Sequence, residues 1–236
     1  MKNPKNERYR RQVGVPEIGE SGQEKLRAAK VLIAGAGGLG SPLALYLAGA
    51  GIGTIGLADD DVVARANLHR QILYDEAQIG LPKVHFAAAR LRALNSEVDV
   101  RAFPQRITSE NARELVAQFD IVADACDNFA TRYLLSDTCA ALGKPYVYGA
   151  VRGFEGQVCV FCVGESPKTY RDLFPDEAGM LAMPHPGKAV IGMAPAVVGA
   201  IQAAEVVKLV VGCGKPLAGI LRTFDLLSAE SRTIAL

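Results

Sequence analysis

Residues 30–61 constrain the fold of this chain most, because they alternate short apolar runs with a spaced set of glycines. Residues 31–34, VLIA, form an apolar run of strand length. Gly35, Gly37 and Gly40 follow at G-x-G-x-x-G spacing. In that pattern the first glycine makes a tight turn, the second lets the backbone approach a phosphate, and the third lets a helix pack closely on a strand.

The rest of this segment completes a strand–helix–strand unit. A helix over about residues 39–49 would direct its N-terminal N–H groups at a phosphate, and residues 54–58 form the second strand. Asp59 ends that strand, where a nucleotide ribose would lie. The pattern predicts a nucleotide site without distinguishing NAD from ATP. The alternative is a unit whose glycines serve packing only.

Composition narrows the classes of function. The 236 residues carry a net charge of +1, which argues against a nucleic-acid surface or a polybasic membrane contact. Five cysteines do not suggest a disulfide framework, and the polar N-terminus shows no signal peptide, so we expect a cytoplasmic protein. The apolar helix predicted over residues 192–211 contains Gln202, Glu205 and Lys208, which favour a buried or subunit-facing helix over a membrane span.

Strands and helices alternate along the first 150 residues, which predicts an α/β protein with a Rossmann-like, doubly wound, mostly parallel sheet. We expect one domain: an N-terminal arm and helix (1–29), a nucleotide-binding core (30–150) and a C-terminal elaboration (151–236) with antiparallel strands and a long crossing loop at 164–188. Further helices are expected at 17–29, 83–94, 109–118 (capped by Thr108) and 129–142, and further strands at 98–103, 120–124, 145–149, 157–163, 221–225 and 231–236.

A long polar connection joins the second strand to the next helix. It spans residues 59–81 and contains ANLHRQ, and connections of this length tend to be functional. Lys83 then lies in the first turn of a helix, where a cation opposes the helix dipole. A bound phosphate would explain it, and a surface lysine without a role is the alternative.

The sequence DACDN, residues 124–128, ends another predicted strand, at the edge where open α/β sheets bind ligands. Asp124 and Asp127 could together hold Mg²⁺, which prefers oxygen ligands. Asp127 could instead, or in addition, cap the helix that follows.

Several separated motifs occur in a fixed order: RYRRQ (8–12), GAGGLGSPLALYLAGAGIG (35–53), DDDVVARANLHRQ (59–71), GLPKV (80–84), DACDN (124–128) and FEGQV (154–158). In this order they resemble the ThiF/MoeB/HesA family, relatives of the ubiquitin-activating enzymes, over about residues 8–234. The resemblance implies a homodimer that uses ATP and Mg²⁺ to adenylate the C-terminal glycine of a small ubiquitin-like sulfur-carrier protein ending in Gly-Gly.

The resemblance also implies roles for individual residues. Arg11 would reach into the ATP site of the neighbouring subunit, Asp59 would bind the ribose, and Asp127 would position Mg²⁺. Arg11, Arg70, Lys83 and Asp127 would act in catalysis. The implied nucleotide contacts are Gly35, Gly37, Gly38, Asp59, Ala66, Asn67, Leu68, His69, Arg70, Lys83, Asp127 and Asn128.

The chain departs from the family pattern at its zinc site. Many relatives hold zinc with two C-x-x-C pairs, but Thr169 and Asp172 stand at the first pair and the chain ends before the second. We therefore expect no structural zinc. Cys159 and Cys162 form another C-x-x-C, but in a strand they would face opposite sides.

The crossing loop also differs from the family pattern. Some relatives carry a transfer cysteine there, but no cysteine lies between Cys162 and Cys213, and His185 falls near that position. A thioester or persulfide step on this loop is not expected. Gly179, Pro184, Pro186 and Gly187 suit a segment that orders over the carrier's tail, and the alternative is a loop that has drifted.

Three other functions remain open at this point. The chain could adenylate a different peptide C-terminus, it could be a NAD-dependent oxidoreductase, or it could be a non-catalytic binding relative. ANLHRQ, Lys83 and DACDN would have no evident task in an oxidoreductase, and the retained phosphate-contacting residues count against a module without activity.

Overall fold

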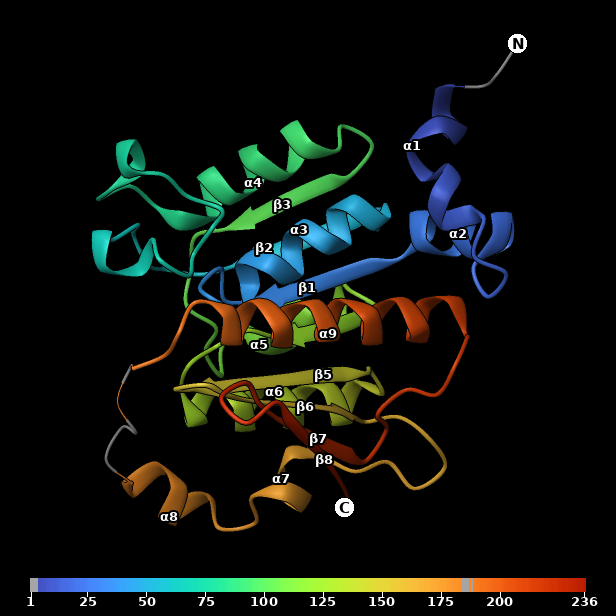
Figure 1. Ribbon diagram of the computed structural model, residues 1–236. Helices are drawn as coiled ribbons and strands as arrows, with labels where there is room; N and C mark the ends of the chain where they lie inside the picture. Colours follow the sequence, from blue (N-terminus) through green and yellow to red (C-terminus); the bar gives the residue numbers. More distant parts are fainter. Residues whose placement is uncertain (1–3, 184–186, 188) are drawn as a thin grey trace.

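An eight-stranded mixed sheet forms the centre of the protein, in a computed structural model that describes residues 4–183, 187 and 189–236 (Figure 1). The strand order is β3-β2-β1-β4-β5-β6-β7-β8, with parallel pairing up to β5 and antiparallel pairing from β5 to β8. This confirms the predicted Rossmann-like fold class. The strands are Lys30–Ala34 (β1), Thr54–Ala58 (β2), Asp99–Phe103 (β3), Ile121–Asp124 (β4), Tyr146–Arg152 (β5), Glu155–Phe161 (β6), Ile220–Asp225 (β7) and Glu230–Ala235 (β8).

Helices cover both faces of the sheet (Figure 1). α3, α4 and α9 contribute to one buried cluster, and α5, α6 and α7 to another on the opposite face. The helices are Pro4–Val13 (α1), Gly19–Ala28 (α2), Gly40–Ala50 (α3), Lys83–Leu94 (α4), Ala112–Ala117 (α5), Phe129–Leu142 (α6), Tyr170–Leu173 (α7), Glu177–Ala182 (α8) and Met193–Val211 (α9), with short 3-10 turns at Arg65–Asn67 (η1) and Glu76–Gln78 (η2).

The continuous apolar run in β1 follows from burial on both faces. Val31 and Ile33 belong to the cluster under α3, α4 and α9, whereas Leu32 belongs to the cluster on the α6 side. Successive strand residues point to opposite faces, so both sets of side chains must be apolar when helices cover both sides.

The glycine turn after β1 depends on two close backbone approaches. Gly35 has φ 103°, and a Cβ there would lie 2.6 Å from the Ala125 carbonyl oxygen. A Cβ on Gly40 would lie 2.1 Å from the carbonyl oxygen of Gly35. These distances confirm the tight-turn and close-packing roles predicted for the two glycines. The phosphate role of Gly37 stays a prediction.

Two local predictions in the first half of the chain are wrong. The segment expected as an N-terminal arm is a helix, α1, because Tyr9 is buried (3% exposed) and anchors it. The helix predicted from residue 109 begins only at Ala112. The Thr108 N–H bonds the Asn111 side chain (2.9 Å), so the residues between form a turn first.

The crossing loop contains two short helices, α7 and α8. Thr169 and Asp172, at the positions of the absent cysteines, form a capping box that begins α7. Cys162 lies beyond β6 with φ 61° and packs on the same cluster as Cys159, so the expectation of opposite faces is wrong. The absence of structural zinc stays a prediction. Pro184, His185 and Pro186 lie outside the described residues.

Among the described residues, α9 has the length and apolar composition that could cross a membrane, which is weak evidence on its own. It packs instead along β5, β6 and α3, within the fold. Its polar side chains have partners there: the Gln202 amide donates to the Asp124 carbonyl (2.7 Å), and the Glu205 carboxylate accepts from the Leu217 N–H (2.9 Å). These contacts agree with the first of the two predicted alternatives, a buried rather than a subunit-facing helix, at these positions.

Candidate active site

A cavity of about 580 Å³ lies at the C-terminal ends of β1 to β4, the edge at which open parallel sheets bind ligands. Its volume is in the usual range for small-molecule sites. Four connections line it: the glycine turn after β1, residues 59–61 after β2, residues 105–107 after β3, and residues 125–132 after β4. Asn67, Arg70, Gln71 and Lys83 complete this half of the cavity.

Asp59 is fixed against the glycine turn. Its Oδ2 accepts a hydrogen bond from the Ala36 N–H (2.7 Å), and its Oδ1 accepts one from the Asp61 N–H (2.8 Å). The Tyr74 hydroxyl donates to the Ala36 carbonyl (2.7 Å), and burial, with the nearby Asp59 charge, raises the Tyr74 pKa. This hydroxyl therefore stays protonated and holds the glycine turn through its hydrogen bond to Ala36.

The ANLHRQ segment folds into η1 and the turns after it. Arg70 donates through Nη2 to the Asn67 Oδ1 (3.0 Å), and its aliphatic stem lies against Gly38, where a Cβ would be 3.4 Å away. Asn67 and Arg70 thus lie together in the cavity lining, and their phosphate contacts stay a prediction. Ala66, Leu68 and His69 belong to the same segment, but they do not appear among the described residues that line the cavity.

Lys83 is buried (2% exposed), so the alternative of a surface lysine without a role is wrong. Its Nζ lies 2.9 Å from the Asp61 Oδ2, and its N–H donates to the Asp61 carbonyl (3.0 Å). The side chain lines the cavity at the N-terminus of α4. Lys83 thus brings a hydrogen-bond donor, paired with Asp61, to the cavity wall.

Asp124 is fully buried and does not face the cavity as a ligand. Its Oδ2 accepts from the Tyr146 hydroxyl (2.8 Å) and pairs with the Arg132 Nε (3.3 Å), while its Oδ1 accepts from the Cys126 N–H (2.9 Å). The hypothesis that Asp124 and Asp127 share Mg²⁺ is therefore wrong for Asp124, because its oxygens are already occupied.

Asp127 and Asn128, in the connection between β4 and α6, are exposed and line the cavity. The helix cap is Asn128, whose side chain accepts from the Thr131 N–H (2.9 Å), so the prediction that Asp127 caps α6 is wrong. Asp127 remains a candidate metal ligand. The carboxylates of Asp59, Asp60 and Asp61, within 4.8 Å of one another, are a second candidate group.

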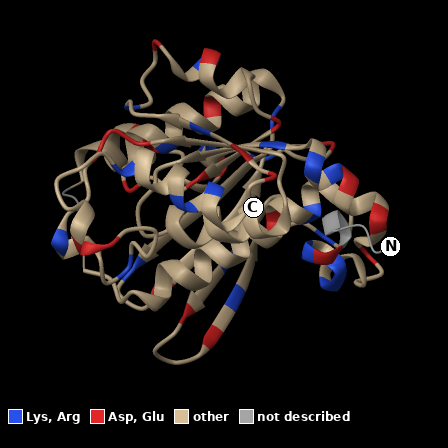
Figure 2. Ribbon diagram, turned by 90° about the horizontal axis from the view of Figure 1, so that it is seen from above, with Lys and Arg blue, Asp and Glu red and all other residues tan. Residues whose placement is uncertain are grey.

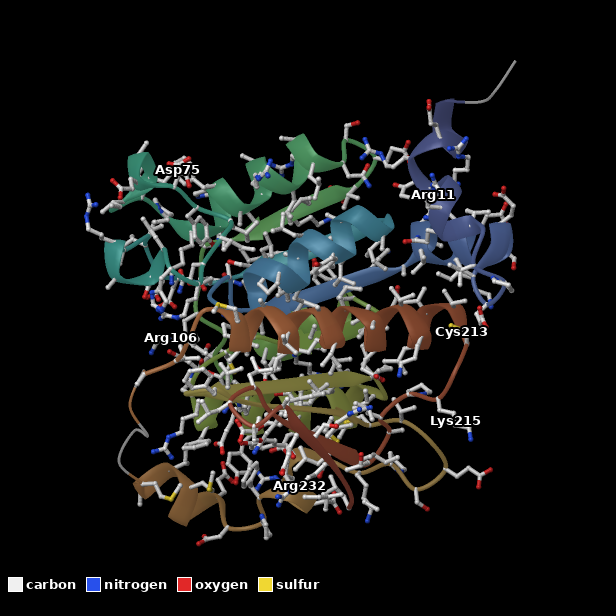
Figure 3. All side chains as sticks on the ribbon, viewed as in Figure 1. Arg11, Asp75, Arg106, Cys213, Lys215 and Arg232 are labelled. Atoms are coloured by element: carbon white, nitrogen blue, oxygen red, sulfur yellow. The ribbon has the colours of Figure 1, made fainter. Side chains whose placement is uncertain are left out.

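Arg11 does not line the cavity of its own chain. It lies on α1, and Figure 3 places it at the opposite end of the molecule from Arg106, which does line the cavity. In its own chain Arg11 thus lies away from the predicted phosphate contacts.

Several residues that line the cavity are not predicted by the sequence patterns. Arg106 pairs with Asp60 (Nε–Oδ2 3.3 Å), and Arg132 donates to the Cys126 carbonyl (2.9 Å). Gln71 directly follows Arg70, so its place in ANLHRQ was a usable signal. The apolar half of the cavity comes from distant segments and left no local pattern; it consists of Ala150, Val151, Leu181, Met183, Gly187, Ala189, Val190 and Pro195.

The thiol of Cys126 lies in the lining but is not activated. Burial, reinforced by the Asp124 charge, raises its pKa, and the thiol donates to the Asp124 Oδ1 (2.7 Å). The thiolate is the nucleophilic form of cysteine, so this environment disfavours nucleophilic attack by Cys126 at neutral pH.

Comparison with known proteins identifies the family. The ThiF family model matches residues 9–236. The chain belongs to the ThiF family. A relative from Thermus thermophilus, named sulfur carrier protein adenylyltransferase, is 48% identical over 233 residues, which cover 97% of this chain and 86% of that protein. The ThiF resemblance seen in the sequence motifs is thereby confirmed.

Other ThiF-related proteins are longer than this chain. Adenylyltransferase and sulfurtransferase MOCS3-1 of Zea mays is 45% identical over 230 residues, and the chain spans about half (49%) of its length. MccB of E. coli, in a structure with ATP, gives a TM-score of 0.86 at 25% identity, over 98% of this chain and 71% of that one. PaaA gives a TM-score of 0.85 at 24% identity, over 100% of this chain and 74% of that one. These two structures support the fold.

Asp124→Ala should lower the free energy of unfolding by about 3–5 kcal/mol, because the buried Arg132 guanidinium would lose its partner. Asp127→Ala is the matched control: its exposed carboxylate should contribute within about 0.5 kcal/mol. Urea denaturation of both variants measures the difference. Equal stabilities for the two variants would contradict the structural role of Asp124.

Proposed function

We propose that this ThiF-family protein uses ATP to adenylate the C-terminal glycine of a small ubiquitin-like sulfur-carrier protein ending in Gly-Gly, and releases pyrophosphate. One observation carries the proposal: a buried lysine, an arginine and an asparagine converge on a glycine turn inside one cavity. Cationic and amide side chains beside a glycine turn are the groups that bind the phosphates of a nucleoside triphosphate. The names of the relatives, adenylyltransferases of sulfur carriers among them, support it.

In this proposal Gly35, Gly37, Gly38, Asn67, Arg70 and Lys83 hold the phosphates, Asp59 the ribose, and Asn128 lies beside the nucleotide; Ala66, Leu68 and His69 shape the turn behind them. The carrier carboxylate attacks the α-phosphorus, a carboxylate–phosphate anhydride forms, and pyrophosphate leaves. No general base is needed, because a C-terminal carboxylate is ionised at pH 7. Catalysis then rests on positioning and on cations placed where negative charge develops.

Mg²⁺ would be held by Asp127, whose exposed carboxylate lines the cavity. When bound, it would neutralise charge on the phosphates. Donor chemistry supports this fit, because exposed carboxylates line the cavity beside the predicted phosphate contacts.

The apolar half of the cavity would receive the carrier's tail. The Gly153 N–H donates to the Ala189 carbonyl (2.9 Å) and the Ile191 N–H to the Gly153 carbonyl (3.0 Å), so residues 189–191 pair with the turn between β5 and β6. Small residues around this passage, Ala150 and Ala189 among them, suit an extended Gly-Gly segment. We propose that the loop at 164–188 covers the tail, within a carrier-binding region at 151–236 that follows the nucleotide-binding core at 30–150.

The reaction should stop at the acyl-adenylate. The crossing loop has no cysteine, and Cys126, the cysteine in the cavity lining, has a raised pKa. Sulfur or acceptor transfer would then belong to another protein.

We also propose a homodimer in which each site receives Arg11 from the partner. Tyr9 accepts a hydrogen bond from the Asn95 amide (2.8 Å), and Gln12 donates to the Ala50 carbonyl (2.9 Å), so α1 is anchored with Arg11 exposed. Met193 (60% exposed) on α9 and Tyr46 (62%) on α3 are exposed large apolar side chains on two helices that pack against each other, which suits contact with a second subunit.

A cytoplasmic location, without nucleic-acid or membrane partners, completes the proposal. Lys and Arg lie interspersed with Asp and Glu around the described ribbon (Figure 2), in keeping with the net charge of +1.

Carrier-dependent exchange of labelled pyrophosphate into ATP tests the proposal. The protein with ATP, Mg²⁺ and a Gly-Gly carrier should catalyse exchange, and Lys83→Ala should slow it by about 10²–10³-fold, because a cation is lost where charge develops. In calorimetry NAD should not bind the protein, and in the exchange assay it should not compete with ATP. Tight NAD binding without ATP binding or exchange would contradict the proposal.

Mixing Arg11→Ala with Lys83→Ala protein tests the shared site. In a mixed dimer one site inherits both defects and the other neither, so equal amounts should recover about one quarter of wild-type exchange. Arg10→Ala, an exposed cation on the same helix, is the control and should behave like wild type. No recovery, with subunit exchange demonstrated, would mean that Arg11 acts within its own chain or not at all.

A further inference from the structure

Gln71 is a buried amide in the cavity lining that no role described so far explains. It follows Arg70, is 4% exposed, and contributes to the wall of the cavity. Its backbone is fixed: its N–H donates to the Asn67 carbonyl (2.9 Å), and its carbonyl accepts from the Tyr74 N–H (3.2 Å). The position of the side chain is therefore set by the turn that also carries Arg70.

The Gln71 side chain has no hydrogen-bond partner among the described residues. Its Oε1 is fully buried and unpaired, and no other interaction accounts for the amide. A buried polar group without a partner is costly and rare in folded proteins. Because the unpaired Oε1 is buried, the group of this amide that remains available to a ligand is Nε2, for which no described residue acts as acceptor.

The Nε2 end of this amide faces the glycine turn. A Cβ on Gly37 would lie 3.4 Å from it, and Gly37 itself lines the cavity. Because Oε1 is enclosed by protein, the amide offers its NH₂ group to the cavity. An N–H donor beside a glycine turn is the chemistry that binds an anionic oxygen.

We infer that the Gln71 Nε2 donates a hydrogen bond to a phosphate oxygen of the nucleotide at Gly37. The inference rests on the proposed ATP-dependent function and adds a binding residue to it. Arg70 and Lys83 supply positive charge nearby. A neutral, buried donor instead fixes where the phosphate sits, since its side chain has little freedom to move.

Two substitutions separate this role from its alternatives. Gln71→Met keeps the length of the side chain and removes the donor. Gln71→Glu keeps the shape but replaces the donor with an acceptor that repels phosphate. Ser41→Ala is the matched control, because Ser41 has a buried, unpaired hydroxyl on α3 but does not appear in the cavity lining.

The experiment measures ATP and adenosine binding by calorimetry for wild type and the three variants, with thermal melting to verify folding. We expect Gln71→Met to bind ATP roughly 10-fold more weakly, and Gln71→Glu more weakly still, with adenosine affinity unchanged in both. Ser41→Ala should match wild type for both ligands. If Gln71→Glu does not fold, Gln71→Met decides alone.

Three results would overturn the inference. Equal losses of ATP and adenosine affinity would mean that Gln71 only supports the fold. Wild-type ATP affinity in Gln71→Met would mean that the proposed hydrogen bond does not form. Retained affinity in Gln71→Glu would show that no phosphate oxygen lies beside this side chain. In each of these cases the proposed function still stands if the wild-type protein binds ATP. If the wild-type protein binds no ATP, both the proposed function and the role of Gln71 are refuted.

Discussion

The buried Asp124 carboxylate is the interaction on which the candidate site depends. It joins the end of β4 to Tyr146 on β5 and Arg132 on α6, while its carbonyl accepts from Gln202 on α9. Four elements therefore meet behind residues 125–128. Because a buried charge without a partner is strongly destabilising, this network fixes the backbone that carries Asp127 into the cavity.

A second constraint acts on the cations. Lys83 pairs with Asp61, Arg106 pairs with Asp60, and Arg70 donates to Asn67. Each cation is thus held at the cavity wall by a neighbouring oxygen rather than by the ligand. Groups held in this way need little reorganisation when negative charge develops, which is how preorganised sites lower a barrier.

The sequence could predict what local patterns encode. The strand–glycine–helix unit and the limits of α4 follow from spacing and turn chemistry, whereas Asn67 and Arg70 were assigned to the site by the family resemblance. The burial of Asp124 could not be predicted, since Arg132, Tyr146 and Gln202, which enclose it, lie 8 to 78 residues away in sequence. Arg106 and the apolar half of the cavity were missed for the same reason: tertiary structure alone assembles them. The late start of α5 reflects a side chain–backbone turn that competes with the helix.

Mass spectrometry of the carrier after reaction tests the central claim most directly. A carrier ending in Gly-Gly, incubated with the protein, ATP and Mg²⁺, should gain AMP at its C-terminus, and a carrier lacking the last glycine should not. No conjugate between carrier and enzyme that thiols cleave should accumulate. Unmodified carrier, despite ATP binding, would contradict the account of adenylation. A thiol-sensitive conjugate lost on mutating Cys126, Cys139 or Cys213 would contradict the claim that the reaction stops at the adenylate.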